Sequence, residues 1–216
     1  MYKPKFKPRP NTSGFIISKP TIDLSHIRTE ISQIPTFKRK VVYLYKQFYK
    51  LRDIQYDKQY WNTKLYEAVL LRNFKHISFN NRRRVILSTT DELNEEELVE
   101  RMLNTLAFVF NSTVYSDDPR IFNEILNFDD LNKAKKSTIE ADVIGTILRL
   151  DGIKPNVIKY DFKYQWWKQL RDDLNKVQDW DNISRKQLKS LKLEWISFYQ
   201  YETTLMRLNE NLKLCL

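Results

Sequence analysis

Apolar and basic positions alternate with helical spacing along residues 39–52, RKVVYLYKQFYKLR. The apolar positions share one face of a helical wheel and are Val41, Leu44, Tyr45, Phe48 and Leu51. Arg39, Lys46 and Lys50 cluster on the opposite face. The pattern predicts an amphipathic helix from about Thr36, a candidate N-cap, to about Arg52. It leaves open whether this is an ordinary core helix or one that offers a basic face to an acidic partner.

A second helix is predicted from about Trp61 to Phe79, and it leads into three consecutive arginines, Arg82, Arg83 and Arg84. Its apolar pattern is less regular, because Arg72 falls beside the apolar positions 65, 68 and 69 on the wheel.

A third helix is marked by Asn94 and Glu97, which have capping-box spacing. Its core stripe is Leu98, Met102, Leu106 and Val109.

The rest of the chain also carries helix signals. Pro119 suits a first helical position after Asp118, and Ser137 with Glu140 repeats the capping-box spacing before a helix that ends near residues 151–155. Two more helical segments are predicted around residues 163–180 and from about 184 to 214. Because the chain has only three glycines and long Leu/Lys/Glu/Asn-rich segments, we expect an all-α protein with no sheet of three or more strands.

The N-terminal segment differs in composition from the rest of the chain. Residues 1–22 hold five Lys or Arg, no acidic residue, and four prolines, which block a regular helix. We therefore expect a basic flexible arm over residues 1–35, a helical bundle over 36–112 and a C-terminal helical extension over 113–216.

Several classes of chemistry lack their sequence signals. One cysteine and two histidines supply no zinc cluster, and the scattered glycines form no phosphate-binding loop. No G-x-S-x-G nucleophile motif is present. No run of about 18 apolar residues predicts a membrane span. We expect a non-enzymatic protein without a cofactor or metal.

Charge is unevenly distributed along the chain. Residues 38–84 contain 13 Lys or Arg and 3 Asp or Glu, whereas residues 85–150 contain 6 and 13. The helices could pair their charges internally, or the basic segment could bind an external acidic partner. A nucleic acid is the alternative partner, because Arg82 to Arg84 and the basic arm could follow a phosphate backbone. The other interpretation of the three arginines is a solvated loop between helices. Trp166 and Trp167 could stack on bases, although at least one is expected in the core.

Leu44-Tyr45-Lys46, followed by LLRNFK at residues 70–75, resembles the LYR-motif proteins of mitochondria. The resemblance implies a three-helix bundle over residues 36–112 whose basic residues contact an acidic acyl carrier protein. Tyr45, Lys46, Arg72 and Lys75 are the matching positions. Lys46 stands where that family has Arg, so it keeps the charge but lacks the planar fork that binds carboxylates in a bidentate way.

A longer resemblance joins VVYLYKQFYKL, LLRNFKHISFNNRRRVILS and above all YETTLMRLNENL at residues 201–212. These segments are similar to the fungal increased-recombination-centres family. That resemblance implies roles in mitochondrial DNA maintenance, genome integrity and sporulation, and hence a mitochondrial location, with a cytoplasmic or nuclear location as the alternative. The leading mechanism is an adapter for an acidic partner; the alternatives are a DNA- or RNA-binding protein and a structural subunit of a mitochondrial assembly.

Overall fold

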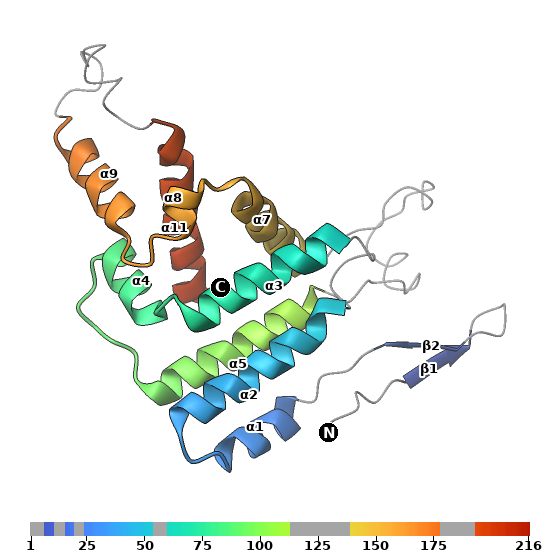
Figure 1. Ribbon diagram of the computed structural model, residues 1–216. Helices are drawn as coiled ribbons and strands as arrows, with labels where there is room; N and C mark the ends of the chain where they lie inside the picture. The colour runs from blue at the N-terminus through green and yellow to red at the C-terminus, as the bar shows by residue number, and fades with distance from the viewer. Residues whose placement is uncertain (1–6, 11–15, 20–23, 54–59, 113–138, 178–192) are drawn as a thin grey trace, which may run out of the picture. The chain divides into compact units, whose positions relative to one another are not determined.

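Helices dominate the computed structural model, which describes residues 7–10, 16–19, 24–53, 60–112, 139–177 and 193–216 (Figure 1). The α-helices are α1 Leu24–Ser32, α2 Phe37–Lys50, α3 Tyr60–Lys75, α4 Phe79–Leu87, α5 Glu95–Asn111, α7 Ile139–Ile153, α8 Asn156–Lys159, α9 Gln165–Asn175 and α11 Leu193–Leu212. A 3-10 turn, η1, spans Leu51–Asp53. The strands β1 Lys7–Pro10 and β2 Ile16–Lys19 pair antiparallel, with Lys7 opposite Lys19. The all-α prediction is confirmed, and the sheet in the described residues has two strands.

The chain forms two compact units. Unit 1 comprises Met1–Thr63 and Leu106–Ile147, and unit 2 comprises Lys64–Thr105 and Leu148–Leu216. Helices α3, α5 and α7 therefore contribute residues to both units.

In unit 1, helix α2 begins directly after Thr36, as its sequence predicts, although the Thr36 side chain makes no capping hydrogen bond. Leu44 and Phe48 are buried, which confirms the apolar face. The helix ends at Lys50 and continues into η1.

Part of the segment expected to be an arm is helical. Helix α1 buries Ile27 and Ile31, whose four-residue spacing places them on one face. This spacing lies outside the proline-rich and lysine-rich residues 1–22, so the predicted arm extended too far along the chain.

The basic cluster lies in a helix and not in an interhelical loop. Helix α3 stops at Lys75, four residues before the predicted end, and Ser78 then caps α4 by accepting a hydrogen bond from the Asn81 amide at 3.4 Å. The described residues between 36 and 112 consequently hold four α-helices, where three were predicted.

Helix α5 begins with the predicted capping box. The Glu97 amide donates to Asn94 Oδ1 at 2.8 Å, and the Asn94 amide donates to Glu97 Oε2 at 3.0 Å. Two otherwise unpaired amides are satisfied reciprocally. The predicted helix starts at Pro119, Ser137 and residue 184 lie outside the described residues.

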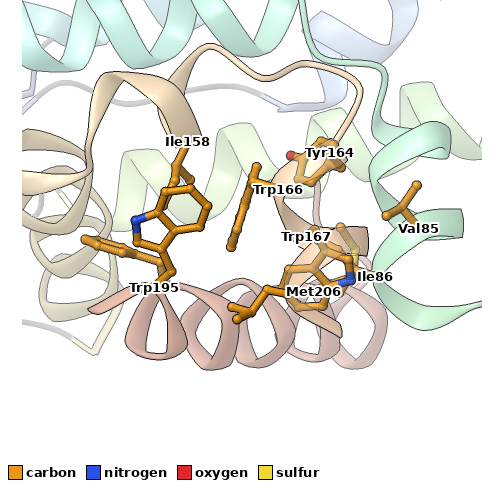
Figure 2. Close-up of a cluster of buried hydrophobic side chains, with 10 residues drawn as sticks. Val85, Ile86, Ile158, Tyr164, Trp166, Trp167, Trp195 and Met206 are labelled. Carbon is orange, nitrogen blue, oxygen red and sulfur yellow. The ribbon is translucent and has the colours of Figure 1, made fainter. Parts of the chain in front are cut away.

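An apolar cluster of unit 2 is built around tryptophans from α9 and α11 (Figure 2). Trp166 and Trp167 are 4% and 1% exposed. Trp167 stacks on Tyr199 with ring centroids 3.8 Å apart, and Trp166 meets Trp195 edge to face at 6.3 Å. Because both indoles are core residues, neither offers a face to a base. Helices α4 and α9 both pack against α11 (Figure 1).

Candidate functional site

The outer face of α2 is basic and partly apolar. Its exposed side chains are Lys38, Arg39, Val42, Lys46, Tyr49 and Lys50. Four of them, at positions 38, 42, 46 and 50, are spaced four residues apart, so they form one stripe along the helix. Helix α2 contains no acidic residue, FKRKVVYLYKQFYK. Val42 and Tyr49 are 48% and 38% exposed among these cations. We call these six residues the α2 face.

Tyr49 is held in place on that face by its neighbours along the helix. The Tyr45 ring stacks at 6.0 Å with an interplanar angle of 23°, and the Arg52 guanidinium lies 3.9 Å from the Tyr49 ring centroid. Lys50 donates to Gln47 Oε1 at 3.1 Å. The tripeptide Leu44-Tyr45-Lys46 thus runs from a fully buried residue through a half-buried one to an exposed cation.

The four residues expected to bind a partner do not share one environment. Tyr45 and Lys46 belong to unit 1, whereas Arg72 and Lys75 belong to unit 2. Lys75 is exposed, but Arg72 is buried and donates to Asp151 Oδ1 in an ion pair. This pairing explains why an arginine interrupts the apolar stripe of α3. Arg72 therefore acts inside the fold, and its predicted contact with a partner would require the ion pair to open.

Arg82 is also buried and is fully engaged within unit 2. Its Nε and Nη2 donate to Glu202 Oε2 at 3.1 and 2.8 Å, and its Nη1 donates to the Leu216 carbonyl at 2.6 Å. Lys154 Nζ donates to Glu202 Oε1 at 2.6 Å. Burial by itself would raise the pKa of Glu202, but Arg82 and Lys154 outweigh burial and lower that pKa to about 2. A carboxylate between two cations stays ionised in the core.

Arg83 extends the pairing to a later turn of α11. Its Nε donates to Glu210 Oε1 at 3.0 Å, and Arg101 binds the same carboxylate with two hydrogen bonds of 2.8 and 3.1 Å. These two arginines lower the pKa of Glu210 against the opposing effect of burial. Arg84 is exposed and lies 3.7 Å from the exposed Glu92. Of the three arginines proposed to contact phosphates, the structure leaves only Arg84 at the surface.

The residues that follow α11 fold back and form hydrogen bonds with Asn209 and Thr105. Asn209, which is fully buried, accepts from the Leu216 amide at 2.9 Å and donates to the Leu216 carbonyl at 3.0 Å. The Cys215 amide donates to Thr105 Oγ1 at 2.7 Å. Burial raises the pKa of the Cys215 thiol to about 12. Residues 214–216 are thereby built into unit 2.

Glu202 and Glu210, the acidic partners of these arginines, were not predicted, although the sequence carries a signal for Glu202. Glu202, Leu205, Met206 and Asn209 follow the i, i+3, i+4, i+7 pattern of one helix face. All four are buried. A carboxylate and an amide inside an apolar stripe indicate buried polar partners.

His76 is exposed and stacks on Phe162 at 4.9 Å. No group of three or more metal-binding side chains gathers among the described residues. None of the described helices has the length and apolar character needed to cross a bilayer.

Comparison with known proteins gives one family. The family model described as "Increased recombination centres protein 19" matches residues 14–216. No curated protein and no solved structure matches. Two segments that carry the resemblance, residues 70–88 and 201–212, are the ones joined by the Arg82–Glu202 and Arg83–Glu210 pairs.

Proposed function

The chain belongs to the increased recombination centres protein 19 family, which indicates a role in recombination or genome maintenance, and we propose that it works there as a non-enzymatic adapter for an acidic protein partner. The α2 face is the proposed contact surface. The observation that supports this most is the exposure of four cations around Val42 and Tyr49 on a helix without a single acid.

The mixture of charge and apolar surface favours a protein over a nucleic-acid backbone. Phosphate binding needs cations and hydrogen-bond donors, whereas Val42 and the ring of Tyr49 contribute only when they are covered by apolar groups. Tyr49 is already ordered by Tyr45 and Arg52, so little side-chain entropy is lost when a partner covers it. Acyl carrier protein is the candidate partner that the LYR resemblance supplies, and of the four matching positions Lys46 and Lys75 are exposed, with Lys46 on the α2 face.

Direct binding of DNA or RNA through Arg82, Arg83 and Arg84 is the weaker alternative. Arg82 and Arg83 already pair with Glu202 and Glu210, and freeing them would take one of its two cations from each carboxylate. Only Arg84 could contact a phosphate without such a loss.

The test uses the full chain and purified acyl carrier protein as the probe. Lys38→Glu/Lys46→Glu reverses two charges of the α2 face, and like charges facing each other can cost several kcal/mol, so binding should weaken by roughly a hundredfold or more. Lys168→Glu/Lys176→Glu is the matched control, because it makes the same change in net charge at exposed positions of the α9 region.

Equal weakening in both double variants would mean that net charge alone governs binding, and the α2 face would be the wrong surface. If acyl carrier protein does not bind the wild type, a native purification compares partners retained by the wild type, the α2 variant and the control. A partner set that is identical in all three would rule out the adapter proposal.

For the biological process, we propose maintenance of mitochondrial DNA and a contribution to sporulation, which rest on the family resemblance. Deleting the gene in a fungal host and restoring it as the wild type or as Lys38→Glu/Lys46→Glu tests both. The wild type should restore mitochondrial DNA retention and spore formation, and the α2 variant should not. If both the wild type and the α2 variant restore these functions, the α2 face is not needed for them.

A further inference from the structure

Three apolar side chains stand out from unit 2 at the corner between α7 and α8. Ile153 is 70% exposed, Val157 is 69% exposed and Tyr160 is 57% exposed. They lie within eight consecutive residues of the chain. Isolated exposed apolar residues are common, but three large ones grouped at one corner indicate an interaction site.

The residues between them are anchored inward, which fixes the corner. Lys154 donates to the buried carboxylate of Glu202 at 2.6 Å, Ile158 is 4% exposed, and Lys159 lies 3.9 Å from Asp151. With the two lysines and Ile158 directed into unit 2, the apolar side chains at 153, 157 and 160 remain at the surface. They are held there by ion pairs and core packing, so their exposure does not depend on a loose loop.

Cations flank the corner. Tyr160 packs edge to face on Phe162 at 6.4 Å, and Phe162 stacks on His76, which is preceded by the exposed Lys75. Lys163 is exposed directly after Phe162. Asp161 is occupied within the turn, where its carboxylate accepts the Trp166 amide at 2.8 Å and the Lys163 amide at 3.2 Å. Of these charged side chains, the two lysines are exposed and Asp161 is partly buried.

We propose that this corner, defined as Ile153, Val157 and Tyr160 with Lys75 and Lys163 beside them, docks the protein reversibly onto an anionic lipid surface. Aliphatic side chains enter the boundary between headgroups and acyl chains, tyrosine favours that boundary, and lysines contact the lipid phosphates. The proposal uses unit 2 only and does not depend on the α2 face.

The strong exposure of the corner favours lipid over a protein partner. Its three apolar side chains are 57% to 70% exposed, whereas Val42 and Tyr49 of the α2 face are 48% and 38% exposed. Side chains that protrude this far can each be surrounded by lipid and contribute separately.

Co-sedimentation of the full chain with vesicles tests the proposal. Vesicles of equal parts phosphatidylcholine and phosphatidylglycerol should bind the wild type, whereas pure phosphatidylcholine should bind much less, and added salt should release the protein. Val157→Asp should lower the partition coefficient about tenfold or more. Val42→Asp is the matched control, because it places the same change at another exposed valine.

Far-UV circular dichroism establishes that both variants are folded, and Tyr160→Ser gives a second variant at the corner. The proposal is overturned if the wild type ignores anionic vesicles, or if Val42→Asp lowers binding as much as Val157→Asp, since the α2 face would then be the lipid contact. It is also overturned if Val157→Asp leaves vesicle binding unchanged and converts a dimer to a monomer in sedimentation velocity. In that case a second copy of the chain covers the corner.

Discussion

Replacing Arg82 by methionine tests whether a buried ion pair holds α4 against α11. The side chains of Arg82 and Glu202 are only 7% and 6% exposed, so solvent screens their attraction little. The substitution removes three hydrogen bonds, two to Glu202 and one to the Leu216 carbonyl. Methionine fills the space of the arginine stem without a charge.

The size of the loss depends on the groups that Arg82 leaves behind. Glu202 keeps Lys154 at 2.6 Å but loses its second cation, and the Leu216 carbonyl keeps only Asn209. Breaking a buried pair by removing one partner costs roughly 3–5 kcal/mol of unfolding free energy. For a chain of this size, that corresponds to a fall in melting temperature of roughly 6–20 °C.

Arg84→Met is the matched control, two positions along the same helix. Arg84 is 56% exposed and faces Glu92, which is 65% exposed, at 3.7 Å. Such surface pairs contribute about 0–1 kcal/mol, so this variant should unfold almost like the wild type. Urea titration followed by tryptophan fluorescence reports on the loss, because Trp167 and Trp195 lie in the same unit.

Similar unfolding free energies for Arg82→Met and Arg84→Met would refute a stabilising role for the buried pair. A double-mutant cycle of Arg82→Met with Glu202→Gln then decides whether the two residues interact at all. Directly paired side chains should show a coupling of about 0.5–3 kcal/mol, and a coupling near zero would assign any loss to packing.

Three further expectations concern local features. The pKa of Glu202 is about 2 in the folded chain and about 4.3, its ordinary value, in the unfolded chain. The ionised carboxylate therefore stabilises the fold fully above about pH 4.3, and this stabilisation is lost as the pH falls toward 2. In Glu202→Gln, the free energy of unfolding should depend less on pH in that window. Asn94→Ala removes one half of the capping box and should cost about 0.5–2 kcal/mol in urea titration; an unchanged midpoint would mean that the cap is not stabilising. Because burial raises the pKa of Cys215 to about 12, a thiol reagent at pH 8 should react slowly with the native chain and quickly in urea, and equal rates would contradict its burial.

Features of the fold that depend on neighbours along the chain could be predicted from the sequence. The apolar face of α2 follows from residues three or four positions apart, and Leu44 and Phe48 are buried as expected. The capping box of α5 joins Asn94 to a residue three positions away. The end of α3 was misplaced because Ser78 starts a new helix just where a longer one had been expected.

The candidate site was only partly predictable, because exposure is a property of the packed chain. Lys46 and Arg72 looked alike as basic residues of helices, yet Lys46 is exposed and Arg72 is buried against Asp151. The α2 face could be predicted as basic, but the ordering of Tyr49 by Arg52 required the geometry of η1.

The amino-acid sequence by itself determines the all-α class, the amphipathic α2 helix and the excess of basic residues. Composition and short-range spacing govern these properties. Which of the charges remain available for a partner depends instead on how the helices pack. Arg72, Arg82 and Arg83 find their acidic partners 79, 120 and 127 positions away in the chain. Charges attract according to their distance in space and the surrounding solvent, and neither quantity exists until the helices have packed.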